Sequence, residues 1–163
     1  MFPVDAIPLP DDVSGRLYAT SFSIVGPDPA STLEDVGAST LLCLITDHEI
    51  GLRYPDYGDW LATDGAIRIL RLPTPDYGVT NDDKLVEMVR AVAALLHKGE
   101  TVVAHCGAGL GRTGVLCTLV LVALGRPLEA AAAEVKRGRP GSGPDSPEQA
   151  EQLARLAPHL HPN

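Results

Sequence analysis

A cysteine and an arginine, Cys106 and Arg112, stand at the two ends of a short glycine-rich loop. An apolar run typical of a strand (residues 101–104) precedes the loop, and an apolar run typical of a helix (residues 115–124) follows it. Strand, glycine loop and helix N-terminus together bind phosphate, because backbone N–H groups converge on the anion and the helix dipole favours it. Since the thiolate is the nucleophilic form of cysteine, the pattern places a nucleophile inside a phosphate site.

Each polar residue type around this loop has a chemical task. The loop amides and Arg112 would stabilise a Cys106 thiolate, and the planar guanidinium can pair with two phosphoryl oxygens at once. Thr113 can donate a hydrogen bond to the sulfur and help it depart as a leaving group. His105, at the end of the strand, can hold loop carbonyls in place and tune the thiolate from behind.

We expect the loop backbone itself to bind the phosphate. Glycines 107, 109 and 111 are expected to adopt φ > 0, so that successive N–H groups point inward. The predicted phosphate-binding set is Cys106, Gly107, Ala108, Gly109, Leu110, Gly111 and Arg112.

Other interpretations of the loop account for fewer of its residues. No Lys-Ser/Thr pair follows the last glycine, so the nucleoside-triphosphate P-loop is not matched. His105 and Cys106 lack a second Cys/His pair, and the five histidines of the chain form no recognisable ligand set. An ordinary strand–helix turn with an incidental cysteine leaves Cys106 and Arg112 unexplained. We therefore expect no metal and no cofactor.

The segment from His105 to Gly114 (HCGAGLGRTG) resembles the signature of the cysteine-dependent protein tyrosine and dual-specificity phosphatases. Residues 72–78 resemble the general-acid loop of the small atypical dual-specificity and kinase-associated phosphatases, and residues 139–141 with 149–153 resemble their C-terminal segment. The resemblance spans residues 15–157 and is weakest over residues 48–66. It implies a single-domain α/β fold of the protein tyrosine phosphatase type.

A leaving oxygen needs a proton, and a carboxylic acid on a nearby loop can supply it. Asp76 is favoured because it follows a strand within a Pro-, Gly- and Tyr-containing loop, and the family resemblance points to the same residue. Asp82 is the alternative, although a charge at a helix N-terminus explains it sufficiently. The resemblance also suggests that Gln149 places the hydrolytic water. Tyr77 could pack on the ring of the substrate or merely anchor its loop.

The predicted function is hydrolysis of phosphotyrosine, and of phosphoserine or phosphothreonine, in a protein or peptide through a cysteinyl-phosphate. Two alternatives stay open: a phosphoinositide phosphatase, and a catalytically silent phosphate-binding regulator. A redox or arsenate-reducing enzyme would need a partner cysteine near the loop. Cys43 could form a reversible disulfide with Cys106, as similar cysteines do in some relatives, but a buried core cysteine is favoured.

Composition agrees with an intracellular enzyme. The chain has 163 residues, enough for one domain with its own core, and three cysteines without close pairing, which favours a reducing compartment. Its net charge of −8 disfavours nucleic acid and anionic membranes as partners. Residues 1–10 show no signal-peptide pattern. We expect a cytoplasmic monomer.

Alternating strands and helices predict an α/β fold with a central, mostly parallel sheet flanked by helices. Strands are expected at residues 16–19, 40–45, 66–72 and 101–104. Helices are expected at 31–36 with a Ser31–Glu34 capping box, at 82–97 with Asn81 as cap, from Pro127 to 135, and from Ser146 to 156. Residues 1–14 are expected to form a loose N-terminal arm, and residues 15–163 the phosphatase domain.

Overall fold

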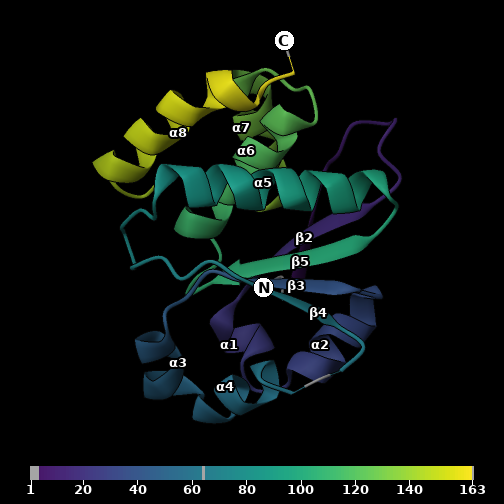
Figure 1. The fold of residues 1–163 in the computed structure, drawn as a ribbon, viewed down its shortest axis with the longest axis vertical. Helices are drawn as coiled ribbons and strands as arrows, with labels where there is room; N and C mark the ends of the chain where they lie inside the picture. Colours follow the sequence, from purple (N-terminus) through teal and green to yellow (C-terminus); the bar gives the residue numbers. More distant parts are fainter. Residues whose placement is uncertain (1–3, 64, 163) are drawn as a thin grey trace.

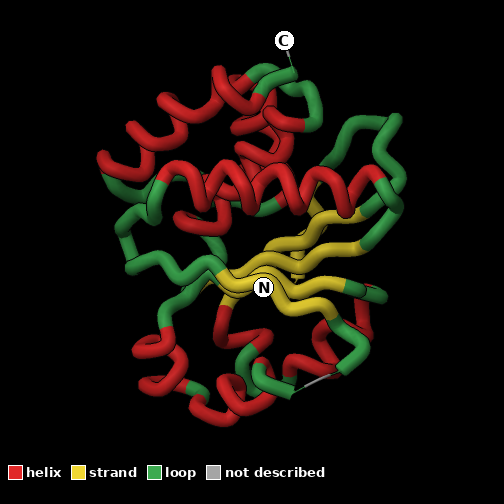
Figure 2. The backbone as a smooth tube through the Cα atoms, viewed as in Figure 1, coloured by secondary structure: helices red, strands yellow, loops and turns green. Residues whose placement is uncertain are grey.

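A five-stranded sheet forms the centre of the computed structural model, which describes residues 4–63 and 65–162 (Figures 1 and 2). The strand order is β1-β2-β5-β3-β4, with β1 antiparallel to β2 and all other neighbours parallel. The strands are β1 (Val4–Ile7), β2 (Arg16–Ser21), β3 (Thr40–Cys43), β4 (Arg68–Arg71) and β5 (Thr101–Cys106).

Helices cover both faces of the sheet (Figure 1). One face carries α1 (Phe22–Val25), α2 (Pro29–Val36), α3 (Asp47–Arg53) and α4 (Pro55–Leu61). The other carries α5 (Asp82–His97), α6 (Gly111–Ala123), α7 (Leu128–Gly138) and α8 (Pro147–Leu160). The predicted fold class, a single α/β domain with a mostly parallel sheet, is confirmed.

Helix α6, which follows the cysteine loop, is the most enclosed helix. Every residue from Gly111 to Val122 is buried, since α6 lies among β5, α5, α7 and α8. This explains why its sequence is apolar all round rather than amphipathic. The loop between β5 and α6 is therefore anchored at both ends in the core.

Most predicted helix caps are found. The side chain of Asn81 accepts from the N–H of Lys84 at the start of α5, and Ser146 accepts from Gln149 N–H at the start of α8. The Ser31–Glu34 capping box was wrong. Helix α2 begins earlier, at Pro29, because Asp28 accepts from Ser31 N–H and proline fits the first helical position.

Three features lie outside the sequence expectations. Residues 4–7 of the N-terminal arm do not lie loose but form the edge strand β1, which pairs with β2; residues 1–3 lie outside the described part of the chain. The strand expected at 40–45 ends at Cys43. The weakly matched stretch 48–66 contains most of α3 and all of α4, and both contribute to the site.

Candidate active site

The backbone carbonyls around Cys106 all point away from the loop centre. Residues outside the loop donate to four of them: Phe22 N–H to Gly107 (2.8 Å), Arg139 Nη2 to Ala108 (2.9 Å), Arg139 Nε to Gly109 (2.8 Å) and Gly143 N–H to Leu110 (2.9 Å). The fifth, the carbonyl of Cys106, lies 3.1 Å from Nδ1 of His105.

The outward carbonyls fix the direction of the amides. In a planar trans peptide the N–H points opposite to the C=O, so the N–H groups that follow these carbonyls turn towards the loop centre. In the described structure no N–H of residues 107–110 donates to the protein itself. Cys106, at the end of β5, is 2% exposed. The result is a ring of free donors beside a sulfur at a helix N-terminus, which suits a tetrahedral oxyanion.

The backbone φ angles of the loop glycines differ from the expectation. Of the three, only Gly109 has a positive φ (74°), and a Cβ there would collide with the carbonyl of Thr20. The prediction of φ > 0 was wrong for Gly107 and Gly111. Gly111 already belongs to α6, and its missing side chain makes room for the carboxylate of Asp145.

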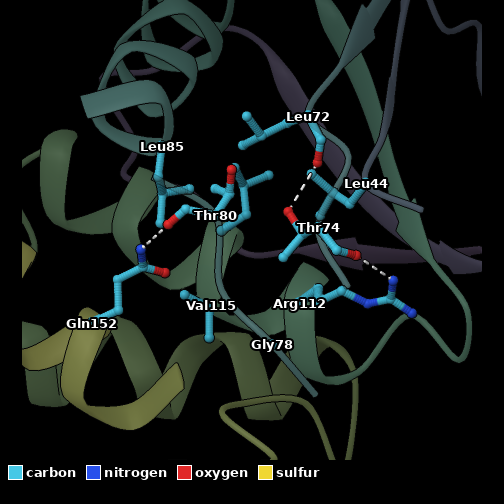
Figure 3. Close-up of a pocket in the computed structure, with 10 residues that line it drawn as sticks. Leu44, Leu72, Thr74, Gly78, Thr80, Leu85, Arg112, Val115 and Gln152 are labelled. Atoms are coloured by element: carbon cyan, nitrogen blue, oxygen red, sulfur yellow. Dashed lines mark hydrogen bonds between the residues drawn. The ribbon is translucent and has the colours of Figure 1, made fainter. Parts of the chain in front are cut away.

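Glu49 holds the guanidinium of Arg112. Arg112 Nη1 and Nη2 donate to the two carboxylate oxygens at 2.7 and 2.9 Å, and Nη1 also donates to the carbonyl of Thr74 at 2.7 Å (Figure 3). Burial opposes the charge of Arg112, whose side chain is 3% exposed, but the bonds to Glu49 outweigh it and raise the pKa. The pKa of Glu49 is lowered: burial opposes this shift, and bonds from Arg112 and Thr46 overcome it.

Asp76 lies at the mouth of the loop. Its Oδ1 is 3.2 Å from Arg112 Nη2 and accepts from the N–H of Tyr77, and its side chain is 59% exposed. A hydrogen bond from Gly78 N–H to the carbonyl of Pro75 closes the turn that carries it. In this turn Tyr77 has φ 60°, unlike every other described non-glycine residue, and it is 61% exposed.

Asp82, the alternative acid, is engaged elsewhere. Arg155 donates to both of its carboxylate oxygens at 2.9 Å, and Gln152 donates to one of them at 3.0 Å. The bonds from Arg155 and then Gln152 lower the pKa of Asp82 to about 2. A carboxylate held in this way is a poor proton donor near neutral pH, so the geometry favours Asp76.

A chain of hydrogen bonds supports the loop from behind. Nε2 of His105 lies 2.5 Å from the hydroxyl of Tyr57 in α4. Burial lowers the pKa of His105 to about 4, so the ring is neutral. Because Nδ1 faces a carbonyl it must carry the proton, and Nε2 then accepts from Tyr57. The predicted support of the loop from His105 is thus directed at the carbonyl of Cys106.

The two other cysteines lie on opposite sides of the sheet. Cys43 pairs in register with His105, so its side chain shares the face of His105, whereas that of Cys106 points to the other face. Such an arrangement does not allow a disulfide between Cys43 and Cys106 without backbone movement. Cys117 lies on the Cys106 side, where burial and the charge of Cys106 raise its pKa to about 12.

The side chains of Thr113 and Gln149 differ in their hydrogen bonding. Thr113 is fully buried, and its hydroxyl has no partner in the described structure, so the expected bond to the Cys106 sulfur is not formed here. Gln149 uses its amide on the backbone: its oxygen accepts from Asp145 N–H at 3.0 Å, and its Nε2 donates to the carbonyl of Gly78 at 3.2 Å.

Sequence reasoning missed Glu49, Tyr57, Arg139 and Gln152. Glu49 is the third helical residue after the cap Thr46, so the Thr46–Glu49 capping box was a readable signal for the helix but not for the bond to Arg112. Arg139 belongs to the C-terminal segment that resembles the family, and the sequence predicts no contact with the loop for it. Arg139 is buried, and besides the loop carbonyls it binds Asp5 at 2.9 Å.

Across residues 4–63 and 65–162, no group of three or more His, Cys, Asp or Glu side chains could hold a metal ion. Within the same residues, no helix combines the length and apolar character needed to cross a membrane.

Comparison with known proteins finds a family match for most of the chain. A family model described as "Swiss Army Knife protein, DSP-PTPase phosphatase domain" matches residues 13–157. The mouse protein "Protein tyrosine phosphatase domain-containing protein 1" is 47% identical over 47 residues, which are 29% of this chain and 6% of the mouse protein. The matched part therefore covers a small fraction of that curated relative.

Solved structures share the fold. The active form of Tk-PTP is similar with a TM-score of 0.73 and 24% identity, covering 98% of this chain and all of that one. A kinase associated phosphatase whose catalytic cysteine is replaced by serine has a TM-score of 0.76, 17% identity and coverages of 98% and 97%. PTPMT1 in complex with PI(5)P has a TM-score of 0.68, 17% identity and coverages of 92% and 93%.

Proposed function

The chain belongs to the DSP-PTPase phosphatase domain family, as its match over residues 13–157 shows, and from this membership we propose that it is a cysteine-dependent phosphomonoester hydrolase. The observation that carries the proposal is the ring of carbonyls turned outward around Cys106, which leaves the loop amides free for three phosphoryl oxygens. The proposed substrates are phosphotyrosine and phosphoserine or phosphothreonine in a protein or peptide.

In the first step the Cys106 sulfur attacks phosphorus, and the bond from phosphorus to the leaving oxygen breaks. Asp76 gives its proton to that oxygen, so a neutral alcohol or phenol departs and a cysteinyl-phosphate remains. Arg112 and the loop amides stabilise the equatorial oxygens, where charge accumulates in phosphoryl transfer.

In the second step water attacks the cysteinyl-phosphate. The Asp76 carboxylate accepts a proton from that water, the sulfur–phosphorus bond breaks, and inorganic phosphate forms. Thr113, with its buried and unpartnered hydroxyl, is proposed to donate to the departing sulfur. Gln149 is proposed to act chiefly through Gly78, since both ends of its amide already bind backbone groups. Tyr77 is proposed to contact the substrate beside Asp76.

Steady-state hydrolysis of p-nitrophenyl phosphate tests the proposal, in EDTA with a reductant, for the wild type and Cys106→Ser. Turnover that persists in EDTA and disappears in Cys106→Ser is expected. Bound phosphate without any wild-type turnover would instead favour a silent phosphate-binding regulator. Parallel assays with a phosphotyrosine peptide, a phosphoserine peptide and a soluble phosphoinositide headgroup then separate the substrate classes.

A further inference from the structure

The loop that carries Asp76 is attached to α8 by a row of side chains. We call residues 72–81, between β4 and α5, the acid loop. Gln149 donates to the carbonyl of Gly78 at 3.2 Å, and one turn later Gln152 donates to the carbonyl of Thr80 at 2.7 Å. Successive contacts of α8 thus follow the second half of the acid loop.

Gln152 also reaches the start of α5. Its Nε2 lies 3.0 Å from Asp82 Oδ1, and Arg155 donates to both oxygens of the same carboxylate at 2.9 Å. Gln152 is 3% exposed, so the donor of both bonds is shielded from water, although the Asp82 carboxylate that accepts one of them is 40% exposed. Arg155, by contrast, is half exposed and its ion pair is weaker for that reason.

A small pocket adjoins the acid loop. The pocket is lined by apolar side chains such as Leu85 of α5 and Val115 of α6, by Thr74 and Thr80 of the acid loop, and by Gln152 of α8 (Figure 3). The β4 end of the acid loop packs well, since Leu72 and Thr74 are buried and Thr74 N–H donates to the carbonyl of Leu44 at 2.9 Å. Beyond Thr74 the acid loop is held by polar bonds from α8, those of Gln149 to Gly78 and of Gln152 to Thr80.

The polar bonds at the β4 end of the acid loop differ from those at its α5 end. At the β4 end, Arg112 donates to the carbonyl of Thr74, so the loop is tied to the phosphate site itself. At the α5 end, Gln152 holds Thr80 and Asp82 together. Asp76 lies between these two attachments, 3.2 Å from Arg112. Loss of the second attachment would leave the bond from Gln149 to Gly78 as the remaining side-chain bond from α8 to the acid loop, so the carboxyl would gain freedom relative to the leaving oxygen, and small displacements of a catalytic group are costly.

We propose that Gln152 is a positioning residue of the reaction: through Thr80 and Asp82 it holds the acid loop so that Asp76 can protonate the leaving oxygen. The proposal rests on the proposed phosphatase function. It assigns Gln152 no contact with substrate. Its effect is confined to proton transfer, because the phosphate loop and Arg112 are fixed by other residues.

A pair of substrates with different leaving groups tests this role. p-Nitrophenolate leaves readily without a proton, whereas the leaving group of phenyl phosphate depends on the general acid. For Gln152→Met, which keeps the volume and removes the donors, we expect kcat/KM for phenyl phosphate to fall about tenfold, part of what a general acid supplies. We expect kcat/KM for p-nitrophenyl phosphate to fall by less than about twofold, and we compare kcat/KM because kcat also contains the later hydrolysis of the cysteinyl-phosphate, which both substrates share. Asp76→Asn should show the same selectivity with a larger loss.

Controls separate the possible failures. Arg155→Gln, at an exposed position, should show the same selectivity more weakly, and it carries the test if Gln152→Met does not fold by circular dichroism. Glu151→Gln, on the exposed side of α8, should match the wild type with both substrates. Equal losses for both substrates, or none, in the folded variants would overturn the positioning role. Absence of wild-type turnover on both substrates would instead overturn the phosphatase function.

Discussion

Glu49 and Arg112 share two hydrogen bonds of 2.7 and 2.9 Å, although they are far apart in the sequence and come from opposite faces of the sheet. The pairing uses Nη1 and Nη2 of the guanidinium and fixes its plane relative to the phosphate loop. A guanidinium that is held in advance loses little freedom when it binds a phosphoryl group.

Glu49→Gln tests this arrangement. We expect kcat/KM to fall at least about tenfold, because Arg112 loses its charged partner and its fixed orientation. Unfolding in urea should show a loss of about 1–2 kcal/mol, typical of a hydrogen bond to a charged group. Asp47→Asn is the matched control: its carboxylate is exposed, and its ion pair with Arg71 should contribute little to either quantity. Unchanged kinetics in Glu49→Gln would show that Arg112 does not need this partner.

Asp76 and Asp82 are distinguished by parallel substitutions. Asp76→Asn is expected to reduce kcat by about 10²-fold or more on substrates with poor leaving groups, since the proton donor is removed. Asp82→Asn is expected to reduce kcat less than about tenfold, because it only loosens the attachment to Gln152 and Arg155. The pH dependence of kcat/KM should keep its general-acid limb in Asp82→Asn and lose it in Asp76→Asn. The reverse ranking would transfer the acid role to Asp82.

His105 makes stability depend on pH. Its pKa is about 4 in the folded protein because of burial, against an ordinary value of 6.5. Between these values the unfolded chain binds a proton that the folded protein does not, so the free energy of unfolding falls as the pH is lowered from about 6.5 towards 4. The slope is up to about 1.4 kcal/mol per pH unit.

Urea unfolding of the wild type and His105→Asn at pH 7, 6 and 5 measures that slope. The wild type should lose stability over this range, and His105→Asn should lose less, because the group that titrates is gone. Parallel curves for the two proteins would mean that His105 can take up a proton without unfolding.

Tyr77 combines a positive φ with an exposed ring. Tyr77→Gly relieves a backbone conformation that costs an L-residue about 1–2 kcal/mol, offset in part by the greater freedom of the unfolded chain. We therefore expect the free energy of unfolding to stay equal or to rise by up to about 1 kcal/mol. KM for aryl phosphates should rise several-fold if the ring packs on the substrate.

Tyr77→Asn is the control for the backbone, since asparagine tolerates this conformation. A rise in KM in both variants assigns the effect to the lost ring. A clear loss of stability with KM unchanged in both would make Tyr77 an anchor of its loop.

The elements that could be predicted from the sequence are those whose signals are local. Helix α5, its cap Asn81 and the loop from Cys106 to Arg112 could be predicted because their residues interact over a few positions along the chain. β1 could not, because a four-residue edge strand has little pattern of its own and forms by pairing with β2. The cap of α2 was misplaced because Asp28 and Pro29 compete with Ser31 for the same role.

Contacts between segments that are distant in the sequence could not be predicted. Glu49 binds Arg112, Tyr57 binds His105 and Gln152 binds Thr80 only once the fold brings α3, α4 and α8 to the same end of the sheet. Arg139 shows the same point, because its partners are carbonyls of the phosphate loop about 30 residues away in the sequence.

The central claim, covalent catalysis by Cys106, is tested most directly by trapping the intermediate. Wild-type protein mixed with p-nitrophenyl phosphate and quenched in acid within milliseconds should yield a peptide phosphorylated on Cys106, identified by mass spectrometry, with a burst of nitrophenol of matching size. The phosphopeptide should be absent from Cys106→Ser. Steady turnover by the wild type without any phosphate on Cys106, or turnover that survives in Cys106→Ser, would contradict the account.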